Sequence, residues 1–185
     1  MKLFFKILVI LILVAVAGLF IFRYATKAHS PEATVDFNQK GLKMEVFYNR
    51  PYKKNRQIFG NLVPFQQVWR TGANEATTFE TNKDILVDGS LLKAGKYTLW
   101  TIPGRESWKI IFNSKMYPWG IKMNGDAYRD PGKDALMLEI PVRPTANTVE
   151  QFTIYFDTGN DFIYLNLAWD DTLIEIPIKQ KNSPD

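Results

Sequence analysis

The residues best suited to chemistry lie in one irregular stretch of the chain, residues 56–79. They supply an indole, a guanidinium, an amide and a carboxylate around a glycine-containing turn: Trp69, Arg70, Asn74 and Glu75. Such a set can bind a polar ligand through charge-assisted hydrogen bonds, with Trp69 as a stacking wall. The same residues fit a structural role, in which Arg70 and Glu75 pair with each other or with backbone carbonyls and fix the loop. We favour the structural role, and the ligand site remains the alternative.

Aromatic side chains could form a second kind of site, a platform for sugar rings. Tryptophan and tyrosine are equally the usual filling of a β-sheet core. Trp169 continues the inward-facing alternation of its predicted strand, so we assign it to the core. Trp119 lies in an irregular segment beside Gly120. We therefore expect Trp119 to be the most exposed tryptophan and count it among the ligand-binding candidates.

Acid–base catalysis would need two carboxylates held several ångströms apart in one cleft. Glu75 is the candidate acid, and the sequence does not pair it with a second acid from the available set: Asp126, Asp130, Asp170 and Asp171. Ser-His-Asp chemistry is excluded because the single histidine, His29, lies at the edge of an apolar segment. There is no cysteine, and the aspartates lack the spacing of a calcium loop. We predict no catalytic residues, no metal and no cofactor.

The net charge of +4 does not indicate a nucleic-acid partner. The four basic residues of segment 1–29 account for all of it, so residues 30–185 carry equal numbers of acids and bases. A basic cluster in the body could touch membrane headgroups, although a solvated loop face is the interpretation that we favour. Its members are Arg50, Lys53, Lys54 and Arg56.

Segment 1–29 has the composition of a membrane anchor. Two lysines precede an unbroken apolar run of sixteen residues, 7–22, which as a helix spans about 24 Å. A cleavable signal peptide is the alternative, because Ala15-Val16-Ala17 has a small-x-small form. The apolar run continues past Ala17, so we favour an uncleaved helix that contacts the lipid bilayer through residues 7–22, with the body exported.

The body predicts an all-β fold. After a short polar linker, residues 24–31, apolar and polar residues alternate in short runs separated by turn formers. Asp88-Gly89 is a two-residue hairpin signal, and we expect further turns at Gly159-Asn160 and at Asp170-Asp171. Nine or ten short strands with hairpin connections predict an antiparallel, jelly-roll-like β-sandwich. The expected strands are 42–48, 76–81, 85–87, 90–92, 96–102, 108–112, 136–142, 152–156, 163–169 and 174–178, and the domains are 1–29, 30–180 and a flexible tail, 181–185.

Several strings in this order resemble a known family. They are S-P-E-A-T-V (30–35), F-Y-N-R-P (47–51), R-Q-I-F-G-N-L-V-P-F-Q-Q-V-W-R-T-G-A-N-E-A-T (56–77), L-L-K-A-G-K-Y-T-L-W-T-I-P-G (91–104), W-K-I-I-F-N (108–113), W-G (119–120) and L-N-L-A-W (165–169). The chain is similar to the domain of unknown function 2911 family of exported bacterial proteins over about residues 30–180. The resemblance implies export and no established activity. An uncleaved anchor departs from the plain signal peptide expected of that family.

These observations favour a non-catalytic binding or interaction module in the periplasm, held at the inner membrane by one helix. Its ligand would be a glycan or an envelope protein, bound through the 56–79 loop. One alternative is a carboxylate-dependent hydrolase that acts on envelope glycans, and another is a structural component of an envelope assembly. Secretion after signal cleavage is the alternative location.

Overall fold

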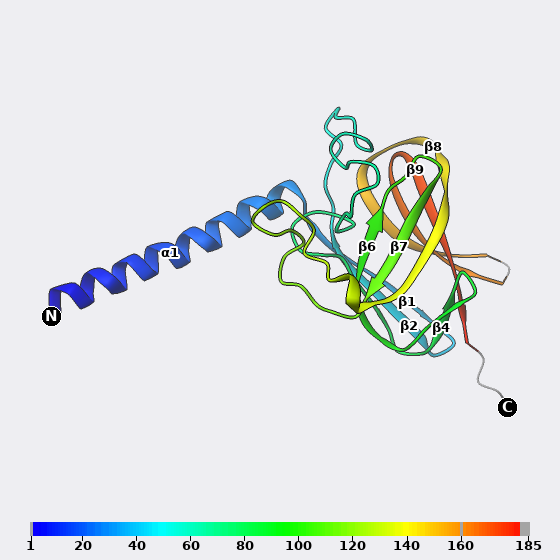
Figure 1. Cartoon of the computed structure of the whole chain (residues 1–185), viewed down its shortest axis with the longest axis horizontal. Helices are drawn as coiled ribbons and strands as arrows, with labels where there is room; N and C mark the ends of the chain where they lie inside the picture. Colours follow the sequence, from blue (N-terminus) through cyan, green and yellow to red (C-terminus); the bar gives the residue numbers. More distant parts are fainter. Residues whose placement is uncertain (1, 160, 182–185) are drawn as a thin grey trace.

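The computed structural model describes residues 2–159 and 161–181, and in it a single long helix, α1 (Lys2–His29), projects from a β domain (Figure 1). An 18-residue window of α1 has a mean hydropathy of 3.0, and none of it is buried against the rest of the protein. Length and composition therefore suffice for a membrane span, and a signal sequence meets the same description.

The helix is longer than the apolar run and includes most of the predicted polar linker. We expected a linker over residues 24–31, but α1 continues to His29. Residues 24–29 contain no glycine or proline, and alanine and lysine favour helix. Pro31 is the first residue to oppose continuation. Loss of hydrophobicity at residue 23 therefore marks the end of the apolar segment and not the end of the helix.

The nine strands found in the described residues form one continuous antiparallel hydrogen-bonding order, β1-β2-β3-β6-β7-β8-β9-β4-β5. This confirms the predicted antiparallel all-β class. The strands are β1 (Glu32–Gln39), β2 (Leu42–Asn49), β3 (Thr78–Thr81), β4 (Ile85–Val87), β5 (Ser90–Leu92), β6 (Gly95–Ile102), β7 (Ser107–Asn113), β8 (Asp134–Thr158) and β9 (Ile163–Gln180), with a short 3₁₀ helix, η1 (Pro131–Lys133), before β8.

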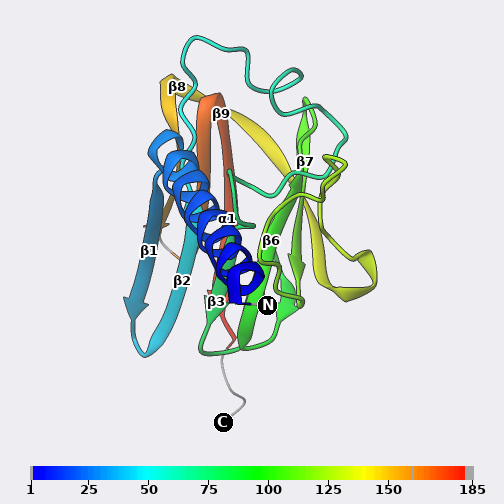
Figure 2. The ribbon, with the colours of Figure 1, turned by 90° about the vertical axis from the view of Figure 1, so that its left-hand side faces the viewer.

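Both ends of this strand order contribute to one hydrophobic core. Alternate residues of β2 are buried from Leu42 onward, and β9 buries Ile174, Ile176 and Ile178. These side chains belong to a single cluster that also draws on β3, β4, β6, β7 and β8. In Figure 2, β9 lies behind the layer of β2, β3 and β6. The period-2 alternation of the sequence thus predicts correctly which residues face inward.

Two pairs of predicted strands are each one long strand, so the predictions of their breaks were wrong. Segments 136–142 and 152–156 both lie in β8, which pairs first with β7 and then with β9. Pro144 does not end it, because shifts in register between residues 144 and 153 absorb the irregularity. Segments 163–169 and 174–178 both lie in β9. Asp170, in the left-handed region with φ 56°, is a local irregularity inside β9 and not a turn.

The hairpin predicted at Asp88-Gly89 is confirmed. Both residues have positive φ, 45° and 77°, as a two-residue type I′ turn requires, and β4 pairs with β5 around them. The predicted Gly159-Asn160 turn includes a residue outside the described ones. The predicted tail, 181–185, lies outside them after Lys181.

Candidate functional site

The end of loop 50–77 and the loop 114–130 pack together over one face of β6 and β7, whereas Ile58 and Val63 of the first loop belong to the main core. A second hydrophobic cluster joins them there, built on Trp100 of β6 and Ile111 of β7 with Ala76 and Tyr117 from the loops. One backbone hydrogen bond, from Gly120 N to Asn74 O at 3.0 Å, ties one loop directly to the other. The loops are therefore ordered by packing although they contain no long strand.

Threonines and backbone groups hold residues 69–77 against β6. Trp69 and Thr101 exchange backbone hydrogen bonds of 2.7 and 3.0 Å. Thr77 Oγ1 donates to Thr71 O at 2.6 Å, and Thr71 Oγ1 lies 3.2 Å from Thr101 Oγ1. Thr71 and Thr77 are buried, so these bonds satisfy groups that water cannot reach. A polar network therefore fixes this loop, as the structural interpretation predicted. It is made of threonines and backbone groups and not of an Arg70–Glu75 pair.

Arg70 and Glu75 are not partners in this network. Among the described residues, Glu75 accepts a hydrogen bond from Asn49 Nδ2 at 3.1 Å and lies 3.9 Å from Lys27 Nζ. Asn74 is buried and donates to Asn49 Oδ1 at 3.3 Å. Glu75 therefore faces β2 and the last turn of α1, on the side where Lys27 lies, and no ion pair with Arg70 forms.

Arg70 is half-buried without a counter-charge. Its aliphatic stem packs so closely on Gly120 that a Cβ there would lie 2.1 Å from Arg70 Cδ. Its Nε atom is buried and has no hydrogen-bond partner among the described residues. Burial lowers the pKa of the guanidinium below its usual value, because desolvation disfavours the charged form. The Arg70 charge is thus held in place by packing and left electrostatically uncompensated.

Trp69 and Arg70 line a pocket of about 300 Å³ at the junction of α1 and the β domain. The indoles of Trp69 and Trp169 stack beside it, with ring centroids 6.0 Å apart and an interplanar angle of 17°. Trp169 Nε1 is a second buried donor with no partner among the described residues. The lining residues are His29, Ser30, Pro51, Lys54, Arg56, Leu62, Val63, Trp69, Arg70, Gly72, Ala73 and Trp169.

The charge of this lining is of one sign. Lys54, Arg56 and Arg70 are cationic, His29 adds an imidazole, and no aspartate or glutamate of the described residues is included. None of these three cations takes part in an ion pair between described residues. Arg56 donates to two backbone carbonyls, from Nε to Lys53 O at 2.9 Å and from Nη2 to Tyr52 O. A carboxylate or phosphate group would complement these charges.

Only some of the predicted ligand-binding residues lie in one pocket of the structure. Trp69 and Arg70 share the pocket, whereas Asn74 and Glu75 lie outside its lining. Trp119 is half-buried in the 114–130 loop and is not in the lining either. Trp169 is in the core, as predicted, yet its edge reaches the pocket. Sequence reasoning did not place His29, Lys54 or Arg56 in a pocket with Trp69 and Arg70, although the basic cluster was a signal for the last two.

A second pocket, of about 410 Å³, is lined by two acids, Asp170 and Asp171, and by Arg105. Lys53 Nζ lies 2.6 Å from Asp170 Oδ2, and Asp171 Oδ1 accepts from Thr172 Oγ1 at 3.2 Å. The two acids are sequence neighbours, and one is engaged by a lysine. Glu75, the candidate acid of the alternative hydrolase interpretation, lines neither pocket. Within residues 2–159 and 161–181, no group of three acidic or histidine side chains could hold a metal ion.

Comparisons with known proteins bear on the family alone. A search of curated proteins finds no match, and a search of solved structures finds none either. One family model, described as protein of unknown function (DUF2911), matches residues 30–178. That range starts directly after α1, contains both long loops and ends at Ile178, two residues before the end of β9, and it confirms the resemblance seen in the sequence. The chain belongs to the DUF2911 family.

Proposed function

We propose that this protein is a non-catalytic binding domain, held by α1 at the outer face of a bacterial inner membrane, with the Trp69–Arg70 pocket as its ligand site. The observation that carries the proposal is the pair of buried, unpartnered donors, Arg70 Nε and Trp169 Nε1, in residues that line one pocket. Buried polar groups are nearly always hydrogen-bonded in native proteins. A ligand with hydrogen-bond acceptors in this pocket would lie beside both residues.

A binding role accounts for the site better than a hydrolytic one. Glycoside hydrolysis needs two free carboxyl groups that flank the scissile bond. Asp170 is paired with Lys53, and Glu75 is bonded to Asn49. No acid among the described residues lines the Trp69–Arg70 pocket. Its cations and indoles are suited to holding an anion.

The anchor is tested by fractionation of cells that express the full chain. We expect alkaline carbonate to leave the protein in the membrane pellet, and mass spectrometry to find residues 1–17 intact. Protease added to spheroplasts should degrade the β domain. A mature N-terminus at Gly18 or beyond would refute the uncleaved anchor and leave the pocket unaffected.

The binding role is tested by thermal denaturation of the full chain in neutral detergent, with a panel of sugars, amino acids, carboxylates and phosphates. Ligand at 100 times its Kd stabilises the native state by about 2.7 kcal/mol. Ala73→Phe, which places a ring in the pocket lining, should abolish the stabilisation. Ala94→Phe, at an exposed position outside that lining, should retain it. Equal stabilisation of both variants would exclude the pocket as the binding site.

A further inference from the structure

We propose that the ligand of the Trp69–Arg70 pocket is a phosphate group, carried by the headgroup of an anionic membrane lipid. The inference rests on the proposed function, and it adds the chemical class of the ligand and its source. Three independent features point to it: the charge of the pocket, its unpartnered donors and its height above the membrane.

Charge selects an anion over a neutral sugar. Three cations line the pocket without an ion pair among the described residues. The neighbouring cations are already engaged: Lys53 pairs with Asp170, and Arg50 donates to Phe152 O and Thr153 Oγ1. A neutral ligand would leave the partly desolvated guanidinium of Arg70 uncompensated. An anion would compensate it directly, which is the more favourable outcome in a half-buried site.

The donor geometry favours phosphate. Arginine presents a planar fork of donors that matches phosphate oxygens, and its hydrogen bonds to such oxygens are charge-assisted. Gly120 fixes the stem of Arg70 from behind, so the fork is positioned before any ligand arrives. Trp169 Nε1 is a donor only and also lacks a partner among the described residues. A group rich in acceptors and without donors of its own, such as a phosphodiester, suits a lining that contains both residues.

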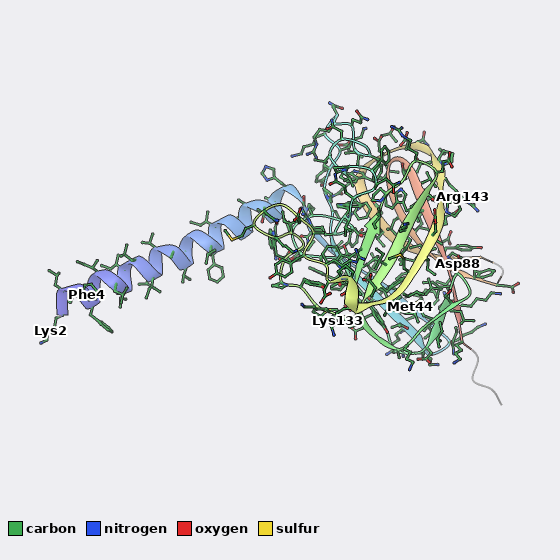
Figure 3. All side chains as sticks on the ribbon, viewed as in Figure 1. Lys2, Phe4, Met44, Asp88, Lys133 and Arg143 are labelled. Atoms are coloured by element: carbon green, nitrogen blue, oxygen red, sulfur yellow. The ribbon has the colours of Figure 1, made fainter. Side chains whose placement is uncertain are left out.

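The pocket lies close to the lipid headgroups. The apolar run ends at residue 22, and α1 continues without a break to His29, which lines the pocket. Seven helical residues rise about 10 Å. Headgroup regions extend roughly 5–8 Å beyond the hydrocarbon on each side. The pocket mouth is therefore within reach of a lipid phosphate, and Figures 1 and 3 show the pocket-bearing loops on the side of the domain from which α1 leaves.

Native mass spectrometry of the full chain, released from nanodiscs that contain equal amounts of phosphatidylglycerol and phosphatidylcholine, tests the inference. We expect the protein to retain phosphatidylglycerol at least tenfold over phosphatidylcholine. Arg70→Gln should reduce this preference below twofold, and Lys54→Gln, at an exposed position that leaves the packing intact, should reduce it at least threefold. Arg143→Gln is the matched control, since Arg143 lies on the side of the domain away from α1 (Figure 3).

The results separate the two sources of phosphate. Equal retention of the two lipids by the native chain overturns the inference, and so does a preference that survives both Arg70→Gln and Lys54→Gln. Arg70-dependent stabilisation by inorganic phosphate or glycerol phosphate, without lipid preference, assigns the pocket to a soluble anion and rejects the lipid source. Stabilisation by a neutral sugar alone rejects the anion and leaves the proposed binding function standing.

Discussion

Gly120 lies directly against Arg70, so an added methyl group there tests how tightly the two long loops pack. A Cβ at this position would lie 2.1 Å from Arg70 Cδ and 2.8 Å from Arg70 Cβ. The arginine stem could move aside, but its Cβ is fixed by the backbone, which Trp69 and Thr77 hold through hydrogen bonds. Gly120→Ala therefore forces one loop away from the other.

The expected cost of Gly120→Ala is that of overpacking, about 1–3 kcal/mol. Gly120 does not have a left-handed φ, so alanine tolerates its backbone conformation and the steric contact is the cause. In a domain of about 150 residues, each kcal/mol shifts Tm by about 2–4 °C. The predicted fall in Tm is therefore about 2–12 °C, measured by scanning calorimetry on the full chain in detergent, and lipid retention should fall with it.

Gly132→Ala is the matched control. A Cβ at Gly132 would meet only Asp130 Oδ1, at 3.4 Å, which is ordinary contact, so we expect a change within about 0.5 kcal/mol. If Gly120→Ala denatures at the same temperature as the native chain and the control, Arg70 does not pack closely on Gly120. Packing on Gly120 would then not explain how the Arg70 side chain is positioned.

Two other positions give sharp expectations. Gly89→Val should destabilise by about 1 kcal/mol or more, because Gly89 has φ 77° while the surrounding space is open; an unchanged urea midpoint would contradict this. Burial raises the pKa of Asp134, but hydrogen bonds from Arg129 and Asn113 outweigh burial and leave it below its usual value. The ionised Asp134 carboxylate therefore adds to the free energy of unfolding at pH values above its unfolded pKa, near 3.9. This stabilisation is lost as the pH falls through the lower pKa of the folded state. Asp134→Asn breaks this bidentate, mostly buried pair and should cost about 3 kcal/mol at pH 7, and stability-versus-pH curves of the two proteins should converge in acid.

Much of the fold could be predicted because local patterns decide it. Alternation in β2 and in Ile174–Ile176–Ile178 of β9 depends only on which face of a strand is buried, and burial follows hydrophobicity. The Asp88-Gly89 turn depends on two adjacent φ angles. The strand breaks predicted at Pro144 and Asp170 were wrong because a long strand can accommodate an irregular residue through a shift in register. Pairing with the neighbouring strands makes this possible, and it is not visible in the local sequence.

The site could be predicted only in part, because it is made of segments far apart in the chain. Trp69 and Arg70 were identifiable from their residue types. Their pocket also needs His29, Lys54 and Trp169, which reach it from α1, from the preceding loop and from β9. The five-residue spacing of Arg70 and Glu75 suggested an ion pair, but the backbone between them has positive φ at Thr71 and at Asn74 and sends the two side chains to different neighbours.

The pairing of β4 with β9 has a consequence for how the chain acquires its structure. Val87 pairs with Ile178 and Ile85 with Gln180, more than 90 positions later in the sequence. A chain made from its N-terminus completes the β4–β5 hairpin long before that partner strand is available. Until then, a short apolar hairpin has an open edge, which invites pairing with other chains, and contacts between such distant segments form slowly. Closure of the core therefore waits for the end of β9, and a chain truncated before Ile178 should aggregate instead of closing its core.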